Sequence, residues 1–197
     1  MGSEMCIRDR FEGSRPKTIP AAIVPVIVGT ASVETGLTFH RFILALMVSI
    51  ALQVGVNYAN DYSDGIRGTD QDRIGPRRLV GSGLINANQV KLAAGISFLI
   101  AAIAGLVLAI MTSLWLILIG CVAILAAWFY TGGSRPYGYS GYGEISVFVF
   151  FGLVATVGSS YVQSQTIESI SILSSVCLLY TSPSPRDLST SRMPSSA

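Results

Sequence analysis

The stretch FILALMVSIALQVGVNYANDYSD, residues 42–64, changes from an apolar run into a cluster of carboxylates within the length of one helix. A run of about 20 apolar residues is long enough to cross a bilayer as a helix. Carboxylates at the end of such a run are costly unless a cation or a water-filled cavity stabilises them. The stretch therefore predicts a membrane-spanning helix that carries a polar functional site at one end.

The rest of the chain has the composition of a membrane protein. Of its 197 residues, 51% are hydrophobic and only 12% are charged, which is about half the charged fraction of soluble domains. Further apolar segments cover residues 19–33, 90–111, 114–130 and 145–162, and another begins near residue 170. We therefore predict an all-α, polytopic transmembrane helix bundle. A net charge of +2 gives no reason to expect a nucleic acid as a partner.

The positions of the basic residues predict the orientation of this bundle. They gather before the first apolar segment, between the second and third, and between the fourth and fifth, as Arg15, Lys17, Arg67, Arg73, Arg77, Arg78 and Arg135. These regions share one side of the bilayer if each apolar segment crosses it once. By the positive-inside rule that side is cytoplasmic. We therefore expect a multi-pass protein of the cell (inner or plasma) membrane, with the N-terminus and the acidic cluster on the cytoplasmic side.

The acidic cluster has the spacing of a helical binding face. Asn57, Asp61 and Asp64 follow one another at i, i+4 and i+7, which puts them on one face of a helix. Two carboxylates on one face repel each other unless a positive charge lies between them. Because Mg²⁺ prefers oxygen ligands, waters and phosphate oxygens, this face predicts a magnesium site. The alternative is a solvated Asp-rich loop that ends the helix, which explains Asp70 and Asp72 better than Asp61 and Asp64.

The loop GPRRLVGSGLI, residues 75–85, presents Arg77 and Arg78 as a pair. A guanidinium fork matches the oxygens of a phosphate group. Next to a carboxylate cluster, the pair therefore predicts a diphosphate-binding site, with Arg67 as a third candidate. The alternative is that these arginines only determine the topology and face lipid headgroups.

The connection WFYTGGSRPYGYSGYGEISVFVFFG, residues 128–152, is dense in glycine and tyrosine. Tyr130, Tyr137 and Glu144, together with Asn57, are the candidates for a pocket that holds an aromatic substrate. For the tyrosines the alternative is an interfacial aromatic belt. For Glu144 the alternative is stabilisation of the N-terminus of the helix that follows it.

The two ends of the chain do not fit its middle. The start, MGSEMCIRDR, and the Ser-, Thr- and Pro-rich tail from Thr181 resemble translated sequencing-adapter sequence. We therefore expect residues 1–10 and 177–197 to be non-native and the transmembrane domain to cover residues 11–176. The native protein is then expected to continue beyond Val176. The alternative is a native polar tail together with an expression scar.

Several motifs together resemble one family. NDYSDGIRGTD, residues 60–70, resembles the first Asp-rich motif of the UbiA superfamily of intramembrane aromatic prenyltransferases, N-D-x-x-D-x-x-x-D. Asn60, Asp61 and Asp64 match this motif, and the last position falls on Gly68. That departure is typical of the branch that makes menaquinone, as are the segments RPKTIPAAIVPVIVGTA, GPRRLVGSGLI and YTGGSRPYGYSGYGEISVFVFFG. The similarity covers nearly all of the chain from Phe11 to the fifth apolar segment.

The resemblance implies a fold, a reaction and a set of site residues. The fold would be a bundle of about nine transmembrane helices, of which this chain holds the N-terminal five to six. The reaction would transfer a polyprenyl group from polyprenyl diphosphate to 1,4-dihydroxy-2-naphthoate, within the lipid bilayer and with Mg²⁺ as cofactor. Loss of CO₂ and diphosphate would then give demethylmenaquinol. Asn60, Asp61 and Asp64 would be catalytic metal ligands, and Asp70 a further ligand.

Two alternatives to this function and one consequence of the resemblance remain. Another UbiA-type prenyltransferase would use hydroxybenzoate or homogentisate as its acceptor. A membrane transporter would instead use the intramembrane carboxylates to bind a coupling ion. The family also implies a second Asp-rich motif after the sixth helix. The printed sequence contains no such motif, so we expect the printed chain by itself to be inactive.

Overall fold

The computed structural model describes residues 13–34, 36–67, 79–80, 85–130, 132, 137, 146 and 148–181. Within these residues the regular secondary structure is helical, without strands. In chain order the elements are η1 Pro16–Thr18, α2 Ile19–Ala31, α3 Phe39–Arg67, α4 Ala87–Met111, α5 Trp115–Phe129, η3 Phe148–Val154, α7 Ala155–Ser164 and α8 Ser169–Thr181. The predicted all-α fold is confirmed. Each apolar segment became a helix, and the π-helical η3 and α7 together form the fifth.

Local sequence explains where several of these helices begin and end. α2 has a proline in its first turn, where a missing N–H costs nothing. α4 begins after Asn86, whose side chain accepts a hydrogen bond from the main-chain nitrogen of Asn88 at 3.1 Å. α7 ends at Gln165, which adopts a left-handed backbone with φ of 58°.

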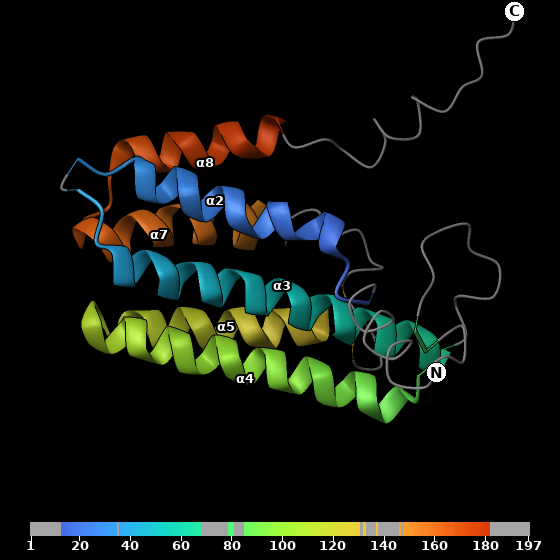
Figure 1. The fold of residues 1–197 in the computed structure, drawn as a ribbon. Coiled ribbons are helices and arrows are strands. Elements are labelled where there is room, and N and C mark those ends of the chain that lie inside the picture. Colours follow the sequence, from blue (N-terminus) through green and yellow to red (C-terminus); the bar gives the residue numbers. More distant parts are fainter. Residues whose placement is uncertain are drawn as a thin grey trace, which may run out of the picture.

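The helices lie side by side as a bundle and alternate in direction (Figure 1). α2 contacts α3, α7 and α8, while α3 also packs against α4 and α5. Because of the alternation, the chain leaves α3 and α5 at the end of the bundle where α2 begins. Each helix thus crosses the bundle once, as the predicted orientation requires, and the orientation itself stays a prediction.

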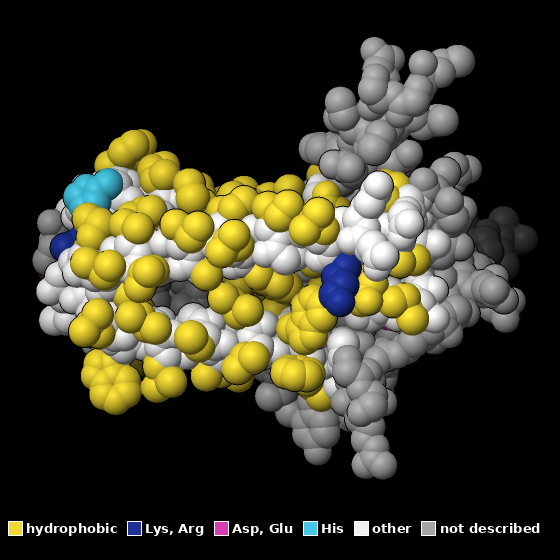
Figure 2. Space-filling model, turned by 90° about the horizontal axis from the view of Figure 1, so that it is seen from below, with side chains coloured by type: hydrophobic (Ala, Val, Ile, Leu, Met, Phe, Trp, Pro, Cys, Tyr) yellow, Lys and Arg dark blue, Asp and Glu magenta, His cyan; other side chains and the backbone are white. Residues whose placement is uncertain are grey.

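The sides of the bundle are apolar. Phe39–Ile66, with 28 residues, and Ala87–Met111, with 25 residues, are long and apolar enough to cross a membrane. Large hydrophobic side chains are exposed along the helices, among them Leu99, Ile110, Leu118, Leu125 and Leu173. Figure 2 shows one face covered by such side chains along its length, with Lys, Arg and His towards its two ends. A surface of this kind suits contact with lipid and not with water.

Small and polar side chains fill the contact between α2 and α7. A Cβ atom added to Gly29 would overlap the main-chain oxygen of Thr156, so the two backbones touch. α7 turns a polar face inward, formed by Thr156, Ser159, Ser160 and Gln163, all of which are buried. Small residues allow this close packing of helices in a membrane. The pattern of apolar segments did not predict this polar face.

Arg41, near the start of α3, ties helices together at the end of the bundle away from the acidic cluster. Its guanidinium donates hydrogen bonds to the main-chain oxygens of Val162 at 3.0 Å, Gln163 at 3.4 Å and Met111 at 3.4 Å. These carbonyls lie at the C-terminal ends of α7 and α4, where they lack partners within the helix and attract positive charge. Arg41 lies at the end of the bundle opposite the predicted basic side, and its role as a cap explains this position.

Replacing Gly29 by Ala should destabilise the bundle, because the new Cβ atom would meet the carbonyl oxygen of Thr156. Overpacking of this kind typically costs about 1–3 kcal/mol. Gly95→Ala on α4 is the matched control, because nothing lies within 4 Å of the position of its Cβ. Thermal unfolding in one detergent should show a lower midpoint temperature for Gly29→Ala than for the parent chain. Gly95→Ala should leave the midpoint temperature unchanged. Equal midpoints would contradict the close contact of α2 and α7.

Candidate functional site

The acidic cluster lies on the last turns of α3. As the spacing of its polar residues predicted, α3 continues beyond the apolar run and through the cluster to Arg67. Asn57, Asp61 and Asp64 are only 3%, 2% and 4% exposed, so they share the buried face of this helix. The predicted common face is therefore confirmed. Asn60 lies beside this face and is partly exposed.

Asp61 is bound to the segment that follows α3. Its Oδ2 atom accepts a hydrogen bond from the main-chain nitrogen of Leu79 at 3.1 Å, and Leu79 is itself only 3% exposed. The main-chain oxygen of Leu79 in turn accepts from the nitrogen of Ile85 at 3.2 Å. A hydrogen bond to a charged group contributes about 1.5–3 kcal/mol. Asp61 therefore also holds Leu79, which lies between α3 and α4 in the chain, against α3.

Two buried carboxylates on consecutive helical turns repel each other, and a cation between them would offset this repulsion. Among the described residues, no three His, Cys, Asp or Glu side chains gather closely enough to form a metal site. The donors that α3 presents are the carboxylates of Asp61 and Asp64 and the amide of Asn60. This all-oxygen set fits Mg²⁺ when phosphate oxygens and waters supply its other ligands.

Asn57 is engaged with the N-terminal hook, which we define as residues 14–18. Its Nδ2 atom donates to the main-chain oxygen of Ser14 at 2.8 Å and to Oγ1 of Thr18 at 2.9 Å. Gln53, one turn earlier on α3, donates from Nε2 to the same Thr18 oxygen at 3.0 Å. The amide nitrogen of Asn57 therefore binds the protein itself. The role of Asn57 in an aromatic-substrate pocket stays a prediction.

Two of the predicted pocket tyrosines come together. The rings of Tyr130 and Tyr137 meet edge to face, with centroids 5.6 Å apart and planes at 90°. The Tyr137 hydroxyl donates to the main-chain oxygen of Ala126 at 2.7 Å and lies 3.1 Å from Oγ of Ser146. Tyr137 therefore braces the end of α5 against the start of the next helix. That these tyrosines line a substrate pocket stays a prediction.

The remaining predicted site residues fall outside the described part of the chain. They are the side chain of Arg67, Asp70, Arg77, Arg78 and Glu144. The diphosphate-binding arginines and the additional metal ligand therefore stay predictions.

Sequence reasoning missed Thr18, Gln53 and Leu79. Gln53 carried a signal, because it precedes Asn57 by four residues and extends the polar stripe of the helix by one turn. Thr18 and Leu79 carried none, since each meets its partners from a distant part of the chain.

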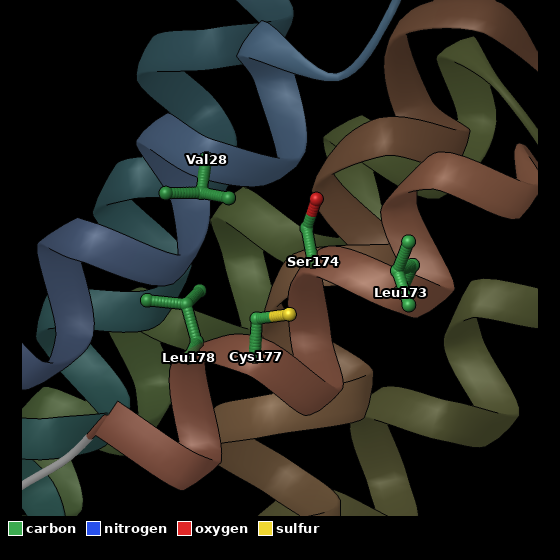
Figure 3. Close-up of a pocket in the computed structure, with 5 residues that line it drawn as sticks. All are labelled: Val28, Leu173, Ser174, Cys177 and Leu178. Carbon is green, nitrogen blue, oxygen red and sulfur yellow. The ribbon is translucent and has the colours of Figure 1, made fainter.

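A shallow pocket between α2 and α8 is a separate feature. Figure 3 shows its lining, which consists of Val28, Leu173, Ser174, Cys177 and Leu178. None of the predicted site residues contributes to it. Its lining is largely apolar and belongs to the sides of the bundle, so we do not place the functional site there.

Comparison with known proteins agrees with the geometry of α3. Residues 22–188 match the model of the UbiA prenyltransferase family. The chain is 51% identical to 1,4-dihydroxy-2-naphthoate octaprenyltransferase of Mycobacterium tuberculosis, over 83% of this chain and 57% of that protein. It is 40% identical to the enzyme of the same name from Escherichia coli, over 83% of this chain and 56% of that protein.

A more distant relative and the coverage complete the comparison. The chain is 34% identical to 2-carboxy-1,4-naphthoquinone phytyltransferase of Synechocystis, over 77% of this chain and 50% of that protein. The chain therefore spans about half the length of the curated relatives that it matches. No solved structure matches it significantly.

Asp61→Asn and Asp64→Asn should each weaken Mn²⁺ binding to the detergent-solubilised chain in the presence of pyrophosphate. Each change removes a negative charge and keeps the shape of the side chain. We expect a loss of about tenfold or more, because even outer contacts of a metal site contribute about 10–100-fold. Glu168→Gln, between α7 and α8, is the control and should bind as the parent does. Electron paramagnetic resonance of free Mn²⁺ measures this, and unchanged binding by both Asp variants would rule the site out.

Proposed function

We propose the function of the complete protein from one premise: this chain belongs to the UbiA prenyltransferase family. We propose that the complete protein transfers a polyprenyl group from polyprenyl diphosphate to 1,4-dihydroxy-2-naphthoate. Diphosphate and CO₂ are released, and demethylmenaquinol is formed. The names of the relatives from M. tuberculosis and E. coli support this acceptor.

One observation carries the proposal, the burial of Asp61 and Asp64 at the end of a long apolar helix. An isoprenoid donor has an apolar chain and a strongly anionic head, and this end of the bundle offers an apolar surface next to a cation site. The anionic head cannot approach two carboxylates directly. A bound Mg²⁺ would neutralise both and stabilise the negative charge of the leaving diphosphate.

The residues of this chain take the following parts. The side chains of Asn60, Asp61 and Asp64, with Asp70, hold the cation site at the end of α3. Arg67, Arg77 and Arg78 bind the diphosphate oxygens through charged hydrogen bonds. The roles of these three arginines and of Asp70 are inferred from the sequence motifs.

The reaction exchanges one bond of the prenyl group for another. The bond between the prenyl carbon and the diphosphate oxygen breaks, and its electron pair leaves with the diphosphate. The ring carbon that bears the carboxylate forms the new carbon–carbon bond. Loss of that carboxylate as CO₂ returns an electron pair to the ring and restores its aromaticity. The apolar bundle excludes water, which would otherwise capture the prenyl cation.

The acceptor ring needs a pocket beside the acidic cluster. We propose that Tyr130, Tyr137, Asn57 and Glu144 contribute to it. The edge-to-face contact of the two tyrosines supports this, because it forms a rigid aromatic wall at the end of α5.

The apolar sides of the bundle and the family identify a membrane protein. We propose that it resides in the cell membrane with the acidic end and the N-terminus in the cytoplasm. The basic residues that flank this end support this orientation.

In the complete protein, Asp61→Asn and Asp64→Asn should each reduce prenyl transfer by about 100-fold or more, because a ligand contributes at least as much as its outer partners. Asp72→Asn is the matched comparison, and it should have a much smaller effect because the sequence predicts a solvated position for that residue. Initial rates at saturating Mg²⁺, with demethylmenaquinol quantified by mass spectrometry, measure this. An unchanged rate for Asp64→Asn would exclude the proposed site, and product formed only from hydroxybenzoate would exclude the proposed acceptor.

A further inference from the structure

The N-terminal hook lies against α3 next to the carboxylates, and no motif assigned it a role. We propose that the hook is a positioning element for Asp61, and that its docking depends on the hydroxyl group of Thr18. The catalytic meaning of this inference rests on the proposed function. Thr18 touches neither a cation nor a substrate in this scheme, and acts through the residues that it holds.

The Thr18 hydroxyl is at the centre of the docking contacts. It accepts hydrogen bonds from the side-chain amides of Asn57 at 2.9 Å and Gln53 at 3.0 Å. It donates to the main-chain oxygen of Arg15 at 2.9 Å. A hydroxyl group offers one donor and two acceptor positions, so all three are in use. The main-chain oxygen of Ser14 accepts a further bond from Asn57 at 2.8 Å.

The backbone of the hook needs these contacts. Arg15 adopts the left-handed conformation, with φ of 51° and ψ of 69°, which residues other than glycine rarely adopt. The Thr18 hydroxyl and the Thr18 main-chain nitrogen both bind the Arg15 oxygen, the latter at 2.8 Å. Unfavourable backbone conformations persist where surrounding contacts hold them, and they concentrate at functional sites.

A chain of direct contacts leads from the hook to Asp61. Gly13, which precedes the hook, is buried against the side chain of Leu79, and an added Cβ would overlap that side chain and come within 3.2 Å of the Tyr58 ring. Leu79 in turn donates its main-chain N–H to Oδ2 of Asp61 at 3.1 Å. The hook therefore covers the residue that orients the Asp61 carboxylate. If the hook undocks, Leu79 loses its packing and Asp61 loses a fixed donor.

Four variants of the chain test this inference. Thr18→Val keeps the shape of the side chain and removes all three hydrogen bonds, whereas Thr18→Ser retains the hydroxyl. Thr30→Val is the matched control on α2, the helix that follows the hook, because the Thr30 hydroxyl is buried and has no hydrogen-bond partner in the described part of the chain. Gln53→Met removes a single bond to Thr18 and serves as a milder second variant if Thr18→Val does not fold.

Two readouts are measured on the detergent-solubilised chain, namely hydrogen–deuterium exchange of the peptide that contains Leu79 and the affinity for Mn²⁺ with pyrophosphate. Thr18→Val should speed exchange at Leu79 and weaken Mn²⁺ binding by about tenfold, the lower bound for losing an outer contact of a metal site. Gln53→Met should shift both in the same direction by less. Thr18→Ser and Thr30→Val should match the parent in both readouts.

Unchanged exchange at Leu79 in Thr18→Val, or in Gln53→Met if only that variant folds, would overturn the inference. An equal change in Thr30→Val would also overturn it, because the effect would then be general loosening of α2. A parent chain that binds no Mn²⁺ would count against the proposed metal site, while the exchange at Leu79 would still decide the role of the hook.

Discussion

The burial of two carboxylates at the end of an apolar helix is the constraint on which the rest of the structure depends. Removing an ionised carboxylate from water costs several kcal/mol unless new partners replace its hydrogen bonds to water. For Asp61, the main-chain nitrogen of Leu79 replaces one of these hydrogen bonds. A cation between Asp61 and Asp64 would replace more. Leu79, in the connection after α3, lies against Asp61 and supplies this donor.

α3 carries charges of the wrong sign at both of its ends. A helix favours negative charge at its N-terminus and positive charge at its C-terminus, yet α3 has Arg41 near its start and Asp61 and Asp64 near its end. Partners must therefore come from other elements. Arg41 finds them in the C-terminal carbonyls of α4 and α7. Asp61 accepts a hydrogen bond from Leu79, and the proposed cation would serve both carboxylates. Both ends of α3 are therefore sites where the bundle is held together.

The sequence predicted those features that one helix determines alone. Apolar runs gave the helices, and the spacing of Asn57, Asp61 and Asp64 gave their common face. Contacts between distant segments could not be predicted from local sequence. The hydrogen bond between Arg41 and Val162, for example, joins residues 121 positions apart. The polar face of α7 was not predicted for another reason. Small hydroxyl residues barely lower the hydropathy of an apolar segment, so the segment reads as uniformly apolar. The last turns of α3 followed from the spacing of its polar residues and not from hydropathy, because the acidic residues interrupt the apolar run.

The way in which Asp61 is held has a chemical consequence. A main-chain N–H is a neutral donor, so the bond from Leu79 orients the carboxylate without cancelling its charge. The amides of Gln53 and Asn57 hold the hook through neutral donors as well. Inside an apolar bundle such bonds are electrostatically stronger than in water. Neutral groups therefore fix the position of Asp61 without offsetting its negative charge. That charge stays available for the proposed cation and, through it, for the proposed diphosphate.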